Sequence, residues 1–139
     1  MCGISGVYNC LNKSIQSKSI IEKILKLQKK RGPDSNGIWE SKCKKLIFGH
    51  NRLSIIDLSN RANQPFVSDD KKYSVTFNGE IYNYKELKIE LTKKNIRFKS
   101  NSDTEVLLES YKYWGIQFVN KLRGMFAFAI WDDVRKELI

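Results

Sequence analysis

An uninterrupted apolar run from Met125 to Trp131 sets the firmest limit on how this chain folds. Its residues lack the polar alternation that marks a strand with one face in water. The run therefore predicts a strand that is buried on both faces. A second stretch, Tyr73–Phe77, alternates and predicts another strand, which leads into the strong turn signal Asn78-Gly79.

Three segments have the spacing of amphipathic helices. In the first, residues 19–30, apolar side chains recur at helical intervals, and Ser19 opens a capping box at its start. Asn83 is predicted to cap a second helix, and Ser102 a third, which Gly115 ends. Further strands are expected at residues 3–8, 37–39 and 45–49.

Strands and helices mix along the chain without a regular strand–helix–strand alternation. This order predicts an α+β protein built as a layered sandwich rather than a doubly wound sheet. A length of 139 residues suits one domain, residues 1–139, and a hydrophobic content of 41% is enough for a core. The chain stops shortly after Trp131, within a predicted hairpin, so we expect this domain to be incomplete at its C-terminus.

The formal net charge of +10 raises the question of a nucleic-acid partner. However, 19 of the 25 basic residues are lysines, and they are spread over most of the chain. Lysine is a mobile, hydrated charge, whereas arginine is the better reader of bases and phosphates. We therefore expect a solvated surface and no nucleic-acid partner. Since no apolar run is long enough for a membrane helix and no signal peptide is evident, we also expect a cytoplasmic protein without membrane contact.

The three cysteines, Cys2, Cys10 and Cys43, form no C-x-x-C pair, and the chain has a single histidine. Zinc sites and disulfide frameworks use grouped ligands, so we expect neither a metal nor a disulfide scaffold. Cys2 stands out because it directly follows the initiator Met1. If Met1 is removed, a thiol and a free α-amine lie on one residue. The pKa of an α-amine is in general about 8, so the amine can accept the thiol proton near neutral pH. The alternative is a cysteine placed there by chance.

An acyl-transfer site also needs donors that are preorganised around the developing oxyanion. Asn78 and Gly79 are candidates, because an amide side chain and a glycine N–H can point at one place; the alternative is an ordinary hairpin turn. An amino-acid substrate needs a cation for its carboxylate and an anion for its ammonium. Arg52, Glu80 and Asp103 are available, although such residues are also common on protein surfaces.

Six sequence blocks, taken together and in order, carry a resemblance to a known family. They are MCGISG at 1–6, RGPDS at 31–35, GHNRLSIIDL at 49–58, FNGEIYNY at 77–84, SDTEVLL at 102–108 and GMFAFAIWD at 124–132. The chain resembles, over essentially its whole length, the N-terminal glutaminase (class II glutamine amidotransferase) domain of glutamine-dependent asparagine synthetases.

The resemblance implies a four-layer αββα sandwich of the N-terminal-nucleophile hydrolase type, here lacking its last strands. It implies removal of Met1, Cys2 as the nucleophile on L-glutamine, and Asn78 and Gly79 as the oxyanion hole. The residues it assigns to glutamine binding are Arg52, Leu53, Ser54, Ile55, Ile56, Glu80 and Asp103, with Arg52 on the α-carboxylate and Asp103 on the α-ammonium.

The resemblance implies no cofactor in this chain. ATP and Mg²⁺ would act in a C-terminal synthetase domain, absent here, that amidates aspartate, and the full-length form could be a homodimer. Asn51 and Asn63 depart from the usual family pattern, and we expect neither to touch the chemistry. Two alternatives stay open: the ammonia could serve another acceptor, such as a surface-polysaccharide sugar, or the chain could be an inactive truncated remnant.

Overall fold

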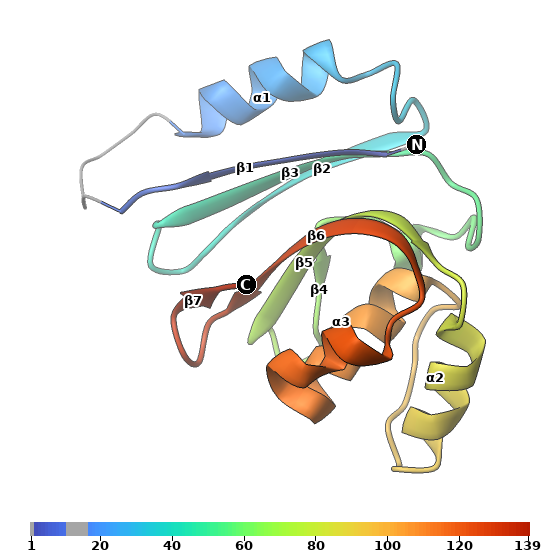
Figure 1. The fold of residues 1–139 in the computed structure, drawn as a ribbon. Coiled ribbons are helices and arrows are strands. Elements are labelled where there is room, and N and C mark those ends of the chain that lie inside the picture. The colour runs from blue at the N-terminus through green and yellow to red at the C-terminus, as the bar shows by residue number, and fades with distance from the viewer. Residues whose placement is uncertain (1, 11–16) are drawn as a thin grey trace.

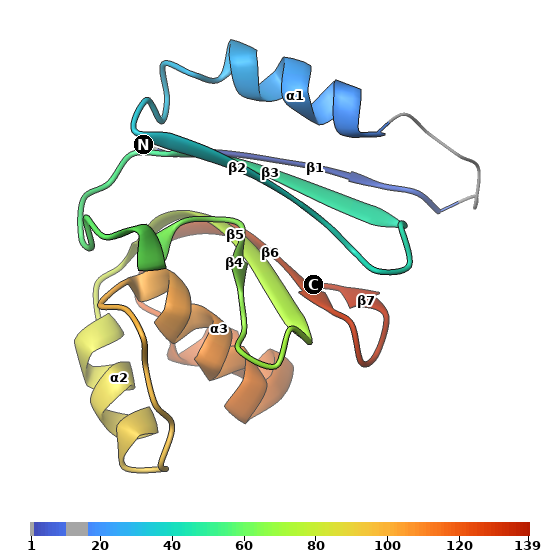
Figure 2. The same ribbon diagram turned by 180° about the vertical axis from the view of Figure 1, so that it is seen from behind.

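A computed structural model describes residues 2–10 and 17–139 as stacked layers of helix, sheet, sheet and helix (Figures 1 and 2). Helix α1 covers the outer face of one sheet. The second sheet packs beneath the first, and α2 and α3 cover its far side. The expected αββα order is confirmed.

Both sheets are antiparallel. The first, in the order β1-β3-β2, comprises β1 (Gly3–Tyr8), β2 (Ser35–Glu40) and β3 (Leu46–Arg52). The second, in the order β4-β5-β6-β7, comprises β4 (Phe66–Val67), β5 (Tyr73–Ile81), β6 (Gly124–Asp132) and β7 (Glu137–Leu138). The strand predicted at 3–8 is confirmed with the same bounds, and those predicted at 37–39 and 45–49 are confirmed as the longer β2 and β3.

The helices are α1 (Ser17–Leu27), α2 (Tyr84–Thr92) and α3 (Asp103–Trp114), with short 3₁₀ segments at Asn60–Ala62 and Gly115–Lys121. The main core lies between β5, β6 and the last two helices, and its fully buried side chains include Val75, Leu91, Leu107 and Ile130. A smaller cluster joins α1 to β3 through Ile21, Leu25 and Ile47. Burial of these apolar surfaces is the main term that holds the layers together.

Helix starts follow the predicted caps in part. The Ser102 hydroxyl accepts the amide of Glu105, and Gly115 ends α3 with a positive φ of 59°, as expected. Asn83 precedes α2, but its side chain bonds Lys121 and Arg123 instead of the helix. Helix α1 begins at Ser17, so the prediction that Ser19 caps it is wrong.

Two strand predictions need correction. Asn78-Gly79 is not a turn, because β5 continues to Ile81 and pairs with β6 along its whole length. Long-range pairing here overrides the local turn preference. The strand β6 is not buried on both faces throughout: Ile130 and Trp131 are fully buried, but Met125 is 73% exposed. The first half of β6 pairs with the end of β5; Phe126 and Phe128 pack against the main core there, and Met125 lines a pocket.

None of the helices within residues 2–10 and 17–139 has the length and apolar character that a membrane crossing requires.

Candidate functional site

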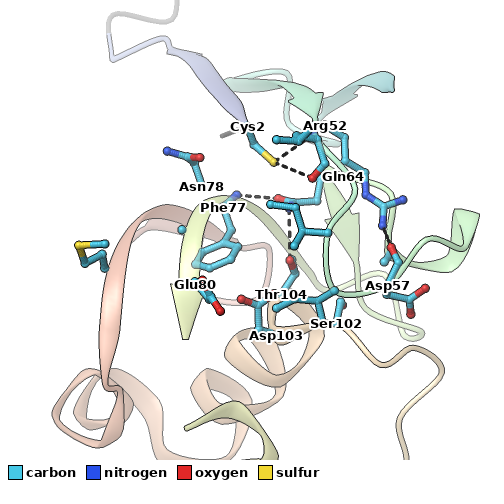
Figure 3. A pocket seen from close by; sticks show the side chains of 16 residues that line it. Cys2, Arg52, Asp57, Gln64, Phe77, Asn78, Glu80, Ser102, Asp103 and Thr104 are labelled. Carbon is cyan, nitrogen blue, oxygen red and sulfur yellow. Dashed lines mark hydrogen bonds between the residues drawn. The ribbon is translucent and has the colours of Figure 1, made fainter. Parts of the chain in front are cut away.

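A pocket of about 190 Å³ opens where the two sheets meet the start of α3 (Figure 3). Its volume lies below the range of drug-sized ligand sites, so it suits a small metabolite. Five chain segments supply the walls: the residue before β1, the stretch from the end of β3 to Gln64, the end of β5, the start of α3 and Met125 near the start of β6. The predicted site residues on these walls are Cys2, Arg52, Leu53, Ile55, Ile56, Asn78, Gly79, Glu80 and Asp103.

Cys2 reaches the pocket because β1 pairs with β3 in a register that places Gly3 opposite Asn51. This register brings Cys2 to the end of β3, where the backbone of Leu53, the residue that follows the strand, lies beside the sulfur. The Leu53 amide donates to Cys2 Sγ at 3.3 Å, and the thiol lies 3.6 Å from the Leu53 carbonyl oxygen. Arg31 Nε donates to the Cys2 carbonyl at 3.2 Å. The thiol is thus held at the pocket by backbone contacts, while Met1 lies outside the described residues.

Asn78 lies on β5, two residues after Thr76. Alternation along a strand places both side chains on the same face. That face looks toward the first sheet, because the Thr76 hydroxyl lies 3.3 Å from His50 Nδ1 on β3. Asn78 therefore belongs to the face of β5 that lies toward the Cys2 sheet, and Figure 3 shows both residues at the pocket.

Gly79 follows at a point where β6 approaches closely. A Cβ added there would lie 2.3 Å from the Met125 carbonyl oxygen, so no larger residue fits without moving the strand. The absence of a side chain at Gly79 lets β5 pair closely with β6. The backbone of Gly79 also forms part of the pocket wall.

Asp103 is the first residue of α3 and only 5% exposed. Its Oδ2 accepts the Ile81 amide at 3.2 Å. Burial raises the pKa of this carboxyl above its ordinary value, against the lowering effect of hydrogen bonds from backbone amides. An acid held this way gains a cationic partner favourably, since a positive charge would offset the burial penalty. Glu80 lies exposed at the rim of the same pocket.

Arg52 is buried, and its guanidinium binds the segment that follows it in the chain. Nη1 donates to the Ser59 carbonyl at 2.9 Å and to Asn63 Oδ1 at 2.7 Å, and Nη2 donates to the Asp57 carbonyl. Asn63, where the sequence departs from the usual family pattern, does not line the pocket, but it accepts a bond from the predicted carboxylate-binding residue. The structure brings Arg52 to the pocket with these donors directed at its own loop.

Ser54 is the one predicted binding residue that does not line the pocket. Its amide donates to Asp34 Oδ2 at 2.7 Å, which ties the loop after β3 to the loop before β2. Its neighbours Leu53, Ile55 and Ile56 do form part of the wall. Ser54 thus contributes to the shape of the loop.

Sequence reasoning missed several residues of the pocket, among them Asp57, Gln64, Ser102 and Thr104 as lining groups. Asp57 accepts the amides of Ser59 and Asn101, both at 2.8 Å. The Ser59 side chain, followed by these amides, holds the pKa of the Asp57 carboxyl below its usual value. Gln64 is a buried amide that bonds two further elements. Asp57 lies inside the 49–58 sequence block, which could have pointed to it as a pocket residue. No motif around Gln64 points to that residue.

Among the residues that the structure describes, no group of three or more His, Cys, Asp or Glu side chains gathers in a way that could hold a metal ion. The side chains at the pocket are a thiol, amides, hydroxyls, carboxylates, one guanidinium and apolar groups. Together they can offer a nucleophile, neutral hydrogen-bond donors and both signs of charge to one small amino-acid-like ligand.

Comparisons with known proteins agree on one family. A family model described as a glutamine amidotransferase domain matches residues 1–139. The chain is 44% identical over 134 residues to a glutamine-hydrolysing asparagine synthetase of Bacillus subtilis, covering 95% of this chain and 21% of that protein. Asparagine synthetase B of Escherichia coli is 37% identical over 133 residues, covering 96% and 23%.

Among solved structures, the glutamine phosphoribosylpyrophosphate amidotransferase of Bacillus subtilis matches with a TM-score of 0.70 at 23% identity, over 95% of this chain and 35% of that one. At this identity the likeness speaks for the fold alone. The chain spans about a fifth of the length of the two synthetases it resembles.

Proposed function

The chain belongs to the glutamine amidotransferase domain family, and from this premise we propose that its pocket hydrolyses the side-chain amide of L-glutamine to glutamate and ammonia. One observation carries the proposal. The Cys2 thiol, the Asn78–Gly79 segment and the buried Asp103 carboxylate all line a single small pocket, although they come from different parts of the chain.

In the proposed first step, the sulfur of Cys2 attacks the side-chain amide carbon of glutamine. After removal of Met1, the free α-amine of Cys2 takes the thiol proton, directly or through a water. The carbonyl π electrons move to oxygen, and this oxyanion receives hydrogen bonds from the Asn78 amide and the Gly79 N–H. The tetrahedral adduct collapses, the C–N bond breaks, and the proton passes to the departing ammonia. A γ-glutamyl thioester remains on Cys2.

In the second step, water attacks the thioester carbonyl and the C–S bond breaks. The α-amine accepts a proton from the water and returns it to sulfur, which regenerates the thiol and frees glutamate. The same oxyanion donors serve both steps, because the oxygen occupies the same place in each. The chain needs no histidine for this chemistry, and its single His50 is buried between the sheets.

Asp103 is the proposed partner of the substrate ammonium and Arg52 that of its carboxylate. Leu53, Ile55 and Ile56 would form the wall along the substrate's methylene groups. Three N–H groups of Arg52 bond its own loop, and since a guanidinium carries five, the remaining donors would serve the substrate carboxylate. Glu80 at the rim would complete the polar mouth of the site.

For the fate of the ammonia, we propose ATP-dependent amidation of aspartate by a synthetase domain, with Mg²⁺ as the metal of that domain. The support is the pair of glutamine-hydrolysing asparagine synthetases that the chain resembles over about a fifth of their length. A cytoplasmic location fits such a reaction, and homodimer formation by the full-length protein is part of the same proposal.

The experiment that tests this function compares L-glutamine with its analogue that lacks the α-amine. L-Glutamine is expected to give ammonia and glutamate in equal amounts. The analogue should be a poor substrate, because Asp103 loses its cationic partner. Failure to release ammonia from L-glutamine would contradict the proposed function, and equal turnover of the two compounds would contradict the role of Asp103.

A further inference from the structure

We propose that Gln64 is a positioning residue of this site, whose side-chain amide aligns the oxyanion strand β5 with the start of α3. This inference rests on the proposed glutaminase function and deepens it. Gln64 is 8% exposed, and both polar atoms of its side chain have partners (Figure 3). Both the nitrogen and the oxygen of its side-chain amide thus bond within the chain.

The first bond extends the pairing of β5 beyond the first residue of β4. Strand β4 pairs with β5 only at Phe66–Val75 and Val67–Ser74. Two steps further in the same register, Gln64 falls opposite Phe77, and here the side chain of Gln64 replaces the main chain. Its Oε1 accepts the Phe77 amide at 2.7 Å. The bond satisfies a buried backbone donor directly before Asn78.

The second bond reaches the helix that carries the proposed ammonium-binding residue. Gln64 Nε2 donates to the Thr104 hydroxyl at 3.2 Å, in the first turn of α3. The neighbouring Asp103 accepts the amide of Ile81. The start of α3 therefore touches β5 through two links, one at Phe77 and one at Ile81.

These two links bracket the segment 78–80, which carries the proposed oxyanion donors. A segment that is held at both ends has little freedom to shift relative to the bound substrate. Displacements of about 1 Å at a reacting group can lower a rate by about 100-fold. Loss of the Gln64 link would leave the Asn78 end held by the pairing with β6 alone, while the Ile81 end keeps its bond to Asp103.

The backbone of Gln64 also touches the sheet of the nucleophile. A Cβ added to Gly37 on β2 would lie 2.3 Å from the Gln64 carbonyl oxygen, so the two chains are in close contact. Gln64 consequently contacts the first sheet, the second sheet and α3 at the place where all three meet.

The test uses substitutions that remove one or both bonds. Gln64→Met keeps the length of the side chain and removes both. Thr104→Val removes the acceptor on α3 alone, and Thr104→Ser restores a hydroxyl there. We expect Gln64→Met to lower the kcat of glutamine hydrolysis about 10- to 100-fold. Thr104→Val should lose less, and Thr104→Ser should regain activity near that of the unaltered protein.

Hydrogen exchange provides a readout that does not depend on turnover. In Gln64→Met, the Phe77 amide is expected to exchange faster, while the Tyr73 amide, which donates to Ser68 Oγ, keeps its rate. Faster exchange at both would show general loosening and contradict a local role. If Gln64→Met does not fold, the kcat values of Thr104→Val and Thr104→Ser test the positioning role instead.

The outcomes separate this inference from the function beneath it. An unaltered protein that does not hydrolyse glutamine would overturn the proposed function and this role together. A working glutaminase whose kcat survives Gln64→Met, or that treats Thr104→Val and Thr104→Ser alike, would overturn the positioning role alone. A loss of thermal stability with unchanged kcat would likewise overturn it.

Discussion

The backbone amide of Leu53 donates to the sulfur of Cys2 across 3.3 Å. Two residues far apart in sequence meet here because β1 and β3 pair in a fixed register. The segment after β3 therefore holds the proposed nucleophile and also forms a wall of the pocket. Substrate binding and nucleophile placement are linked through this one stretch of chain.

Asn78→Ala should remove one oxyanion donor without changing the groups proposed to bind the α-ammonium and α-carboxylate of the substrate. An oxyanion donor acts mainly in the transition state. We therefore expect the activation free energy to rise by about 3–4 kcal/mol, which lowers kcat, with little change in KM. Steady-state kinetics with L-glutamine measure this directly. A change confined to KM would contradict the oxyanion role of Asn78.

Gly79→Ala should disturb the pairing of β5 with β6. The added Cβ would lie 2.3 Å from the Met125 carbonyl oxygen and 2.6 Å from Phe126 Cα, so a strand must move. We expect lower thermal stability together with loss of glutaminase activity. As a control, Gly6→Ala meets its nearest atom at 3.3 Å and should cost much less. Equal thermal stabilities of the two variants would argue against the close approach.

Asp103→Asn should weaken glutamine binding and stabilise the fold. Because burial raises the pKa of Asp103, its ionised form is less favourable in the folded chain than in the unfolded one, and a neutral amide avoids that cost. For the same reason, KM of the unaltered protein should rise as pH falls through this raised pKa. Thermal unfolding and KM at several pH values measure both effects.

The matched control for Asp103 is Asp69→Asn, which alters an exposed carboxyl paired with Lys99. Glutamine affinity should not respond to this control. Destabilisation by Asp103→Asn would contradict the burial cost of the ionised carboxyl. A KM that does not depend on pH in the unaltered protein would contradict the role of Asp103 in glutamine binding.

His50 predicts an acid sensitivity of the sandwich. Burial, aided by the nearby Arg52 charge, lowers the pKa of this histidine to about 4. The neutral ring is therefore favoured in the fold, so its contribution is complete above about pH 6.5 and is lost as pH falls toward 4. The full loss is about 3 kcal/mol in the free energy of unfolding.

Urea unfolding between neutral and mildly acidic pH tests this, with His50→Gln as the comparison. The variant should lose less stability on acidification than the unaltered protein, because glutamine does not titrate. Parallel pH profiles for the two proteins would show that His50 is not the responsible group.

Much of the site could be anticipated from short motifs. Cys2, Asn78 and Asp103 stand in distinctive sequence blocks, and the structure brings all three to one pocket. The cap at Ser102 was also predictable, since a serine three residues before a glutamate acts locally. Such features depend on neighbours in sequence and need no knowledge of the fold.

Other features depend on contacts between distant segments. The turn expected at Asn78-Gly79 is replaced by a strand because β6 offers a long pairing partner. The role of Gln64 follows from β4 beginning only at Phe66, so that the side chain of Gln64 takes the place of a strand backbone opposite Phe77. No local pattern reports where a neighbouring strand stops, so neither could be predicted from residue preferences.

The most direct test of the account is ammonia release from L-glutamine by the unaltered protein and by Cys2→Ala, with Cys10→Ala as the cysteine control. Mass spectrometry of the N-terminus accompanies the assay, because the proposed base exists only when Met1 has been removed. We predict turnover by the unaltered protein and by Cys10→Ala, an N-terminus at Cys2, and no turnover by Cys2→Ala. Glutaminase activity that survives Cys2→Ala would contradict the account.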